Sequence, residues 1–256
     1  MATWTPGALS SERRRLSGTA WRIVEAQHRI STAKLVDTLT EQARLEELLE
    51  RSKPPMPPEC VGLHYLLGTP FRYGAPYPHG SRFRRAGLTP GVFYASKTIG
   101  TAVAETAFHR LLFFVDSPGM PWPDNAGEFT AFSVRYRTAA GLDLAAPSLD
   151  RDRAVWTHPT DYGPCQDLAV SARDAGGQVL RYPSARDPAP GGGTNLALLT
   201  CRAFGAPQPV ERQTWRIHLA GTGVRAICTF PEMRFEFGRS AFARDPRIAG
   251  LRWDRP

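Results

Sequence analysis

Residues that could act on an anionic, aromatic ligand follow one another in one stretch of the chain. Arg82 stands in a basic cluster with Arg84 and Arg85, Tyr94 lies in a short apolar run, and Glu105 in an amphipathic run. Guanidinium groups suit phosphate because they are planar and always charged, and a carboxylate can stabilise developing positive charge. The stretch suggests a cleft that binds and splits a molecule such as a dinucleotide. A surface arginine loop, a packed tyrosine and a solvated helix face would fit the same spacing.

The elements that must position these residues follow from the hydrophobic pattern. The apolar run 91–95 predicts a strand that ends near Tyr94, and the run after it predicts a helix to about Phe114. Glu105 and His109 are four residues apart, so they share one face of this helix. One carboxylate and one histidine are too few ligands to indicate a metal site, and no metal is expected. A structural, hydrogen-bonded histidine is the simpler interpretation.

A helical extension is expected at the N-terminus, over residues 1–58. Residues 21–27 and 31–51 read as two helices, and leucines form an apolar stripe along the second one. We expect this stripe to pack on the main domain, with a partner protein as the alternative. The proline run 53–58 ends the helix because proline cannot continue it. The catalytic domain is then expected over residues 59–256.

Strand patterns dominate the second half of the chain. Alternating apolar residues or short apolar runs predict strands, and one helix is predicted between them; residues 138–164 look irregular. The predicted strands lie around 132–136, 178–182, 196–202, 215–219, 224–230 and 233–237, and the helix at 165–175. Several strands follow one another without helices between them, which favours an α+β fold with an antiparallel or mixed sheet as its core.

Composition narrows the class of partner. The chain has 256 residues and a formal net charge of +8, which favours a nucleotide, a nucleic acid or an acidic protein. The four cysteines, Cys60, Cys165, Cys201 and Cys228, show no zinc-ligand spacing. We expect them to be reduced thiols in a cytoplasmic protein. No apolar run approaches the ~20 residues that span a bilayer, no secretory signal pattern opens the chain, and no membrane partner is expected.

Several familiar motifs are missing from the sequence. Gly191-Gly192-Gly193 lacks the Gly-Lys-Ser/Thr ending of a phosphate loop, and no Rossmann fingerprint is present. Ser184 lacks the Gly-x-Ser-x-Gly context of a nucleophile elbow. No nucleic-acid-binding motif accompanies the arginines. A basic nucleic-acid-binding or RNA-cleaving module, which would bind with steep salt dependence, is the alternative from a different class.

Taken in order, these residues resemble the RES-domain family, the toxin halves of RES–Xre toxin–antitoxin pairs. The family is named for an arginine, a glutamate and a serine. The matching residues are Arg82 in Gly-Ser-Arg-Phe, Glu105 in Ala-Val-Ala-Glu-Thr-Ala, and Ser184 in Tyr-Pro-Ser-Ala-Arg. Tyr94, in Gly-Val-Phe-Tyr-Ala-Ser, resembles the family's tyrosine, and Asn195 a frequent asparagine after the serine.

The resemblance covers roughly residues 63–202 and carries expectations about fold and activity. It implies a fold like that of ADP-ribosyltransferases and a toxin that cleaves the nicotinamide–ribose bond of NAD, by phosphorolysis or hydrolysis. It also implies an Xre-type antitoxin protein as partner, and no direct binding of nucleic acid. Transfer of ADP-ribose to a cellular protein is the alternative. Ser81 and Phe83 stand where a glycine and a tryptophan are commoner, which leaves the acceptor (water, phosphate or protein) open.

The resemblance also implies roles for single residues. Glu105 would stabilise the oxocarbenium-like state in which the bond breaks. Arg82 would bind the diphosphate or an incoming phosphate, and Tyr94 would stack on the nicotinamide ring. Ser184 would hydrogen-bond nicotinamide or the adjoining ribose and fix its orientation. Two further ligand contacts are expected, from Arg72 to a phosphate and from Asn195.

Overall fold

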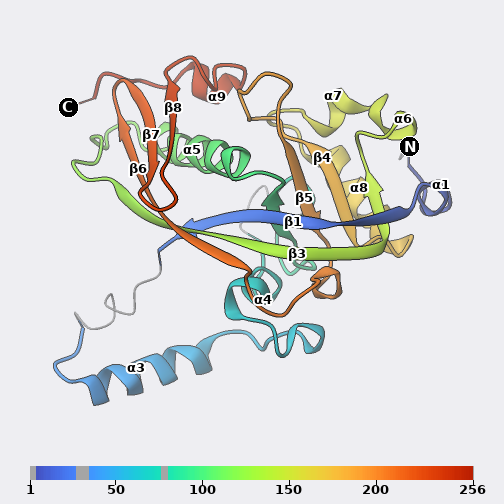
Figure 1. Ribbon diagram of the computed structural model, residues 1–256, viewed down its shortest axis with the longest axis horizontal. Coiled ribbons are helices and arrows are strands. Elements are labelled where there is room, and N and C mark those ends of the chain that lie inside the picture. The colour runs from blue at the N-terminus through green and yellow to red at the C-terminus, as the bar shows by residue number, and fades with distance from the viewer. Residues whose placement is uncertain (1–3, 27–34, 76–79, 256) are drawn as a thin grey trace.

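The structure, a computed structural model, describes residues 4–26, 35–75 and 80–255. Within these residues eight strands form one mixed sheet in the order β1-β2-β5-β4-β3-β6-β7-β8, surrounded by helices (Figure 1). The strands are β1 (Arg14–Glu25), β2 (Phe93–Ser96), β3 (Gly127–Asp143), β4 (Val179–Pro183), β5 (Thr194–Leu198), β6 (Glu211–Ala220), β7 (Gly223–Cys228) and β8 (Met233–Gly238). The predicted α+β class with a mixed sheet as its core is confirmed.

Most of the helices are short. They are α1 (Pro6–Ser11), α3 (Leu39–Ser52), α4 (Tyr65–Arg72), α5 (Ile99–Val115), α6 (Pro147–Asp150), α7 (Arg153–Trp156), α8 (Gly163–Asp174) and α9 (Pro246–Ala249), with 3-10 turns η1 (Pro58–Cys60) and η2 (Cys201–Ala203). The predicted helices that become α5 and α8 are confirmed. The segment 138–164, predicted to be irregular, instead holds the end of β3 and the helices α6 and α7.

Five strands of the sheet, β1, β2, β5, β4 and β3, pair in a closed ring. β1 pairs along most of its length with β3, and through Trp21 opposite Ser96 it also pairs with β2. β5 and β4 complete the path from β2 back to β3, where β3 and β4 run parallel. A sheet that closes in this way brings β1, from the start of the chain, next to the strands of the central stretch.

β1 corrects the expectation for the N-terminus. The helix predicted over 21–27 is wrong, because residues 14–25 form a strand; residue 27 lies outside the described residues. The run Trp-Arg-Ile-Val is too short to separate a helix from a strand by periodicity, and its pairing with β3 decides in favour of the strand. The division of the chain at residue 58 stays a proposal, and the α-helices described before it are α1 and α3.

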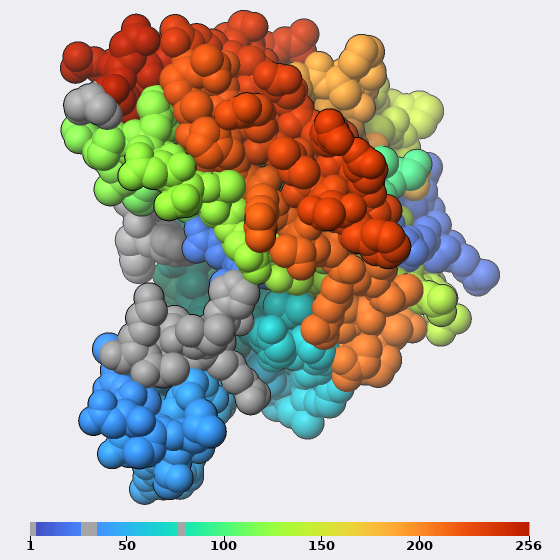
Figure 2. All heavy atoms as spheres, turned by 60° about the vertical axis from the view of Figure 1, so that its left-hand side comes forward, coloured from blue at the N-terminus to red at the C-terminus, as the bar shows by residue number. Residues whose placement is uncertain are grey.

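α3 follows the predicted leucine-rich helix, with residues 31–34 of that prediction outside the described residues. It starts at a capping box, in which Thr38 and Glu41 each accept a hydrogen bond from the other's backbone N–H. None of its residues is buried, and Leu48 and Leu49 are exposed. Figure 2 shows α3 at one end of the molecule, well apart from β6–β8. The expected packing of its stripe on the main domain is therefore wrong.

α5 is the helix that fixes the centre of the fold. The Thr98 hydroxyl caps its N-terminus by accepting a hydrogen bond from the Thr101 N–H. Phe108 and Leu111 are buried in one cluster with Trp215 of β6. Burying a side chain of this kind contributes about 1.5–3 kcal/mol, so the helix is anchored through one face while another remains for a site.

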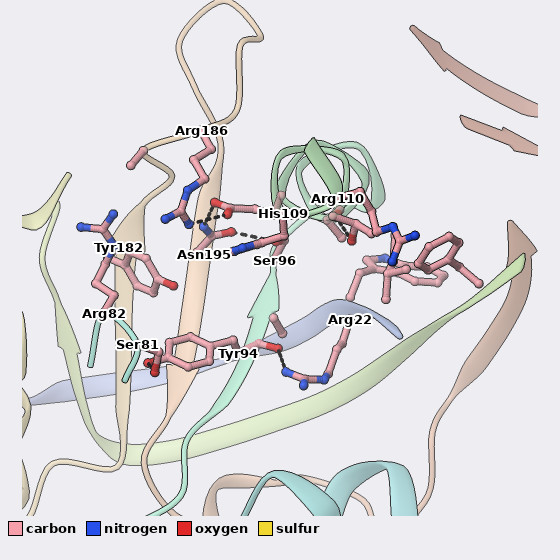
Figure 3. A pocket seen from close by; sticks show the side chains of 18 of the residues that line it. Arg22, Ser81, Arg82, Tyr94, Ser96, His109, Arg110, Tyr182, Arg186 and Asn195 are labelled. Atoms are coloured by element: carbon pink, nitrogen blue, oxygen red, sulfur yellow. Dashed lines mark hydrogen bonds and ion pairs between the residues drawn. The ribbon is translucent and has the colours of Figure 1, made fainter. Parts of the chain in front are cut away.

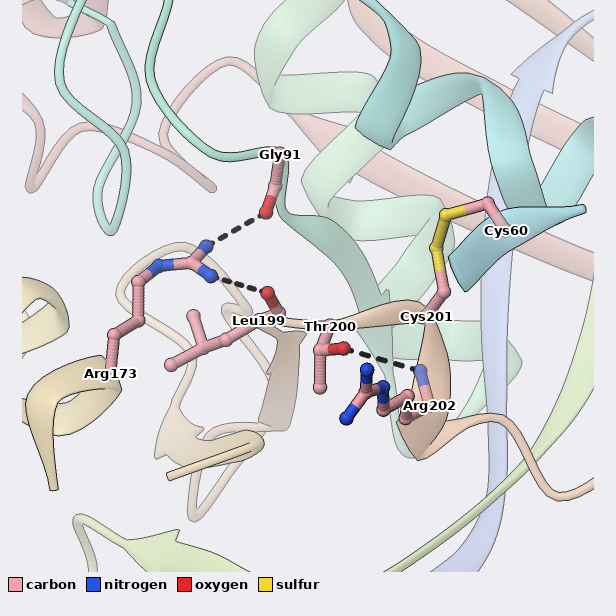
Figure 4. Close-up of a disulfide and its surroundings, with 7 residues drawn as sticks. All are labelled: Cys60, Gly91, Arg173, Leu199, Thr200, Cys201 and Arg202. Atoms are coloured by element: carbon pink, nitrogen blue, oxygen red, sulfur yellow. Dashed lines mark hydrogen bonds between the residues drawn. A yellow bond between two sulfur atoms is a disulfide. The ribbon is translucent and has the colours of Figure 1, made fainter. Parts of the chain in front are cut away.

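A disulfide joins Cys60 of η1 to Cys201 of η2 (Figure 4). It corrects the expectation of four reduced thiols, because only Cys165 and Cys228 are free, and both are buried. The two bonded cysteines are 141 residues apart, so their spacing in the sequence gave no sign of the pair. Among the described residues, no helix is long and apolar enough to cross a membrane.

Candidate active site

A cavity of about 440 Å³ lies between one face of α5 and the strands β1, β2 and β5 (Figure 3). α5 presents Glu105, His109 and Phe113 to it, which is the four-residue spacing of one helical face. The strands contribute Tyr94 and Asn195. Residues far apart in the sequence thus meet at one site.

Glu105 is the most heavily bonded side chain of the cavity. Its Oε1 accepts hydrogen bonds from the Ser184 hydroxyl, at 2.7 Å, and from Asn195 Nδ2, at 2.6 Å. Its Oε2 accepts one from Arg186 Nη1 at 3.1 Å. A carboxylate with three donors is held in a single orientation and in its ionised form. The three sequence-predicted residues Glu105, Ser184 and Asn195 are therefore brought together.

Burial and these partners shift the pKa of Glu105 in opposite directions. Burial alone would raise the pKa, but the charge of Arg186 and the hydrogen bonds from Ser184 and Asn195 outweigh it, and the pKa lies below its ordinary value. Glu105 is therefore negatively charged at neutral pH. A fixed negative charge beside a cavity is the feature needed to stabilise a positively charged transition state.

Asn195 is itself oriented by a neighbouring strand. Its Oδ1 accepts a hydrogen bond of 2.7 Å from the Ser96 hydroxyl, which fixes the amide so that Nδ2 faces Glu105. Ser96 of β2 and Asn195 of β5 are paired in register, so the contact follows from the sheet. Sequence reasoning missed Ser96, which carries no motif of its own.

Ser184 binds Glu105 and the turn after β4. Its hydroxyl donates to Glu105 and accepts from the backbone N–H groups of Arg186 and Asp187. Its neighbours Ala185 and Arg186 line the cavity. Ser184 thus holds Glu105 in place, and its expected hydrogen bond to nicotinamide or the adjoining ribose stays a prediction.

Arg186 is a second residue of the site that sequence reasoning missed, although it closes the Tyr-Pro-Ser-Ala-Arg motif. Besides Glu105, its guanidinium donates to the Tyr162 hydroxyl and lies 4.4 Å from the ring centroid of Phe108. Tyr162 precedes α8, so it comes from a segment that no motif marked. The signal available in the sequence was an arginine two residues after the family's serine.

Arg82 lines the cavity but is anchored away from it. Its side chain is buried, Nη1 donates to the Trp156 carbonyl at 2.8 Å, and its guanidinium stacks on Tyr162 at 4.7 Å from the ring centroid. Arg82 and Arg186 therefore meet on the same tyrosine. Gly80, at φ +66°, makes the turn before Arg82, and a Cβ there would collide with the backbone of Arg84.

Tyr94 holds the loop that carries Arg82. Its hydroxyl accepts a hydrogen bond from the backbone N–H of Phe83 at 2.9 Å and shares one with the Ser81 hydroxyl at 2.8 Å. Burial raises the pKa of Tyr94, so the phenol stays neutral. Its ring lines the cavity, which is compatible with the expected stacking on a ligand.

His109 lies one turn after Glu105 and also lines the cavity. Burial, and then the charge of Arg186, lower the pKa of His109 to about 4. The imidazole is therefore neutral at physiological pH. In the described part of the chain, no three His, Cys, Asp or Glu side chains lie close enough to hold a metal ion.

The remaining arginines of the motif region lie outside the cavity. Arg84 donates to the carbonyls of Tyr73 and Thr89, and Arg85 pairs with Asp167. Arg72, predicted as a second phosphate contact, pairs with Glu50 of α3 at 2.5 Å. It is not part of the cavity lining, so the structure does not bring it together with Glu105.

Unpartnered guanidinium nitrogens gather around the cavity. Among the described residues, five buried side-chain nitrogen or oxygen atoms lack a hydrogen-bond partner, and four of them belong to arginines that line the cavity. These atoms are Arg22 Nε, Arg82 Nη2, Arg110 Nε and Arg186 Nε. Buried donors without acceptors are costly, and the four arginines give the cavity wall a positive charge that favours an anionic ligand.

An α+β chain in which Arg82 and Glu105 line one cavity, with Ser184 bonded to Glu105, matches one family model. The RES domain model covers residues 56–220, more than half of the chain, and the chain belongs to the RES-domain family. No curated protein matches the chain. Among solved structures, the chain is similar to the M. tuberculosis MbcT–MbcA toxin–antitoxin complex, with 15% identity and a TM-score of 0.46, over 81% of this chain and 89% of that chain.

Proposed function

We propose that this protein is the toxin of a toxin–antitoxin pair and that it cleaves the nicotinamide–ribose bond of NAD, by phosphorolysis or hydrolysis. The observation that supports the chemistry most is the ionised Glu105 on the cavity wall, held by Ser184, Asn195 and Arg186. The family membership supports the assignment to a toxin, and an Xre-type antitoxin protein is part of the same proposal.

Cleavage of the nicotinamide–ribose bond is helped most by a negative charge near the ribose. Nicotinamide leaves as a neutral amine, so the reaction needs little help from a general acid. Positive charge develops on the ribose as the bond breaks, as in glycoside cleavage. In this proposal Glu105 faces that ribose and stabilises the charge, while Ser184 and Asn195 act as positioning residues that keep the carboxylate still.

The arginines supply the complementary part of the site. A dinucleotide carries two phosphate charges, and Arg82 and Arg186 both line the cavity. Guanidinium groups bind phosphate well because their donors are planar and permanently charged. In this proposal the Tyr94 ring packs on nicotinamide at the end of the cavity near Arg82.

Nicotinamide release from NAD by the purified protein, with and without phosphate, tests the proposal. Glu105→Gln keeps the shape of the side chain but not its charge, and we expect at least ~100-fold slower release, about 2.7 kcal/mol of barrier. Binding of ADP-ribose by calorimetry checks that the variant still folds and binds. A folded Glu105→Gln protein with near-normal release would remove Glu105 from this role.

The same experiment separates the acceptors. Release that requires phosphate would identify a phosphorylase, and release without it a hydrolase. Labelled NAD added to a lysate distinguishes ADP-ribosylation, which would mark a protein band. No release and no labelled protein would reject NAD chemistry and favour the nucleic-acid-binding alternative.

A further inference from the structure

The cavity has two ends of different chemistry. Glu105 lies at one end with Arg186, and Phe113 lies two helical turns further along α5 at the other. The eight-residue separation of Glu105 and Phe113 corresponds to about 12 Å along the helix axis. A dinucleotide is longer than this, so one that is bound along α5 can contact both ends.

The second end combines an ion pair with aromatic rings. Arg110 Nη1 donates to Glu25 Oε1 at 2.6 Å, and the Arg110 guanidinium lies 5.8 Å from the Phe113 centroid and 5.9 Å from that of Phe129. Trp21 lines the cavity beside them. Figure 3 shows Arg110 next to rings on the side of the cavity away from Arg82. We call these five residues, Trp21, Glu25, Arg110, Phe113 and Phe129, the aromatic end.

β1 supplies part of this end. Trp21, Ile23 and Glu25 alternate along the strand, so they point to the same face, and all three line the cavity. They lie before residue 56, where the family match begins. The aromatic end therefore needs a strand that the family model does not cover.

We propose that the aromatic end is the subsite for the adenine nucleoside of a dinucleotide, with Phe113 and Trp21 contacting the base and the Glu25–Arg110 pair reading its edge. This inference rests on the proposed function, because it places the second half of the same substrate. Aromatic side chains and guanidinium planes are the surfaces on which bases stack.

The ion pair selects adenine over a base with a carbonyl at the same position. Adenine presents an amino donor next to a ring-nitrogen acceptor. Glu25 accepts from the amino group, and the Arg110 guanidinium, which is paired with Glu25 and partly exposed, donates to the ring nitrogen. Hypoxanthine has a carbonyl oxygen in place of the amino group, which would face the Glu25 carboxylate without a proton between them.

Binding of AMP and IMP, measured by calorimetry, tests the subsite without any turnover. The wild-type protein should bind AMP more tightly than IMP. Phe113→Ala should weaken AMP binding about tenfold through lost stacking. Glu25→Gln should reduce the preference for AMP over IMP about tenfold, because the glutamine amide can also donate to a carbonyl.

Matched control variants exist elsewhere on the surface. Ile227→Ala truncates an apolar side chain about as exposed as Phe113, 48% against 47%. Glu232→Gln changes an ion-paired glutamate about as exposed as Glu25, 71% against 67%. Both controls should bind AMP and IMP as the wild type does, and melting temperatures should show that all four variants fold.

The outcomes separate this inference from the proposed function. No AMP binding by the wild type, or unchanged binding in folded Phe113→Ala and Glu25→Gln, overturns the subsite. The expected AMP and IMP pattern in a protein that releases no nicotinamide supports the subsite while rejecting the proposed cleavage.

Discussion

Arg186 places Nη1 3.1 Å from Oε2 of Glu105, and both side chains are largely buried, with 11% and 17% of their surfaces exposed. Neither charge is well solvated, so each depends on the other. The pair explains how a carboxylate can sit in a cavity wall and stay ionised. It also makes Arg186 responsible for the pH range in which Glu105 carries its charge.

Arg186→Gln should therefore move the acid limb of the NAD-cleavage profile to higher pH. Removing the arginine leaves burial to raise the pKa of Glu105, so the carboxylate is protonated at a higher pH than in the wild type. The rate against pH gives the shift directly. Arg234→Gln, which breaks the exposed pair with Glu232, should leave the profile unchanged. An unshifted acid limb in Arg186→Gln would contradict the role assigned to the ion pair.

His109 should make the fold sensitive to mild acid. Its pKa falls from 6.5 to about 4 on folding, so between these values the unfolded chain binds more protons than the folded one. Stability should decrease as the pH falls from about 6.5 to 4, by at most ~3 kcal/mol. Urea unfolding at several pH values measures it. His109→Gln should show a flatter dependence, and an equal slope in both proteins would refute the assignment.

Arg82→Ala should destabilise the protein as well as weaken NAD binding. The substitution leaves the buried Trp156 carbonyl without its donor and removes the stacking on Tyr162. Loss of one such partner costs about 1–3 kcal/mol. Thermal unfolding and calorimetry on the same sample separate the two effects. Unaltered NAD binding in the folded variant would exclude Arg82 from the phosphate site.

Reduction should lower the melting temperature of the wild-type protein. The bond between Cys60 and Cys201 restricts the unfolded chain over a long loop, and such a disulfide typically contributes 2–4 kcal/mol. The double variant Cys60→Ser/Cys201→Ser should melt lower and should not respond to reducing agent. A wild-type melting temperature that reductant leaves unchanged would contradict this contribution.

Much of the site followed from the order of residue types along the chain. Arg82, Glu105 and Ser184 were recognisable because their order and local context resemble those of the RES-domain family, and Asn195 donates a hydrogen bond directly to Glu105. The helix that carries Glu105 was also predictable, because its apolar period is long and uninterrupted. The contacts of each side chain were less predictable. For example, the Ser184 hydroxyl donates a hydrogen bond to Glu105, which its sequence context did not indicate.

The missed features depend on contacts across long sequence separations. β1 was mistaken for a helix because its pairing with β3 decides its conformation. The sequence alone does not distinguish Arg72 from an arginine that lines the cavity, because its ion pair with Glu50 forms only in the folded chain. Arg186 had a recognisable position but no motif that distinguishes an ion-pair partner from a turn residue. Tertiary pairing, which local propensity does not contain, accounts for each case.

The disulfide encloses most of the cavity lining in one covalent ring of the chain. The ring runs from Cys60 to Cys201, and it includes Glu105, Ser184 and Asn195 together with most of the aromatic end. A protease nick in the exposed segment 188–192 would leave both pieces linked on a non-reducing gel. Trp21 and Glu25 lie outside the ring, on a strand held in the sheet by hydrogen bonds. Release of β1 would therefore remove these two side chains from the cavity while the covalent ring stays closed.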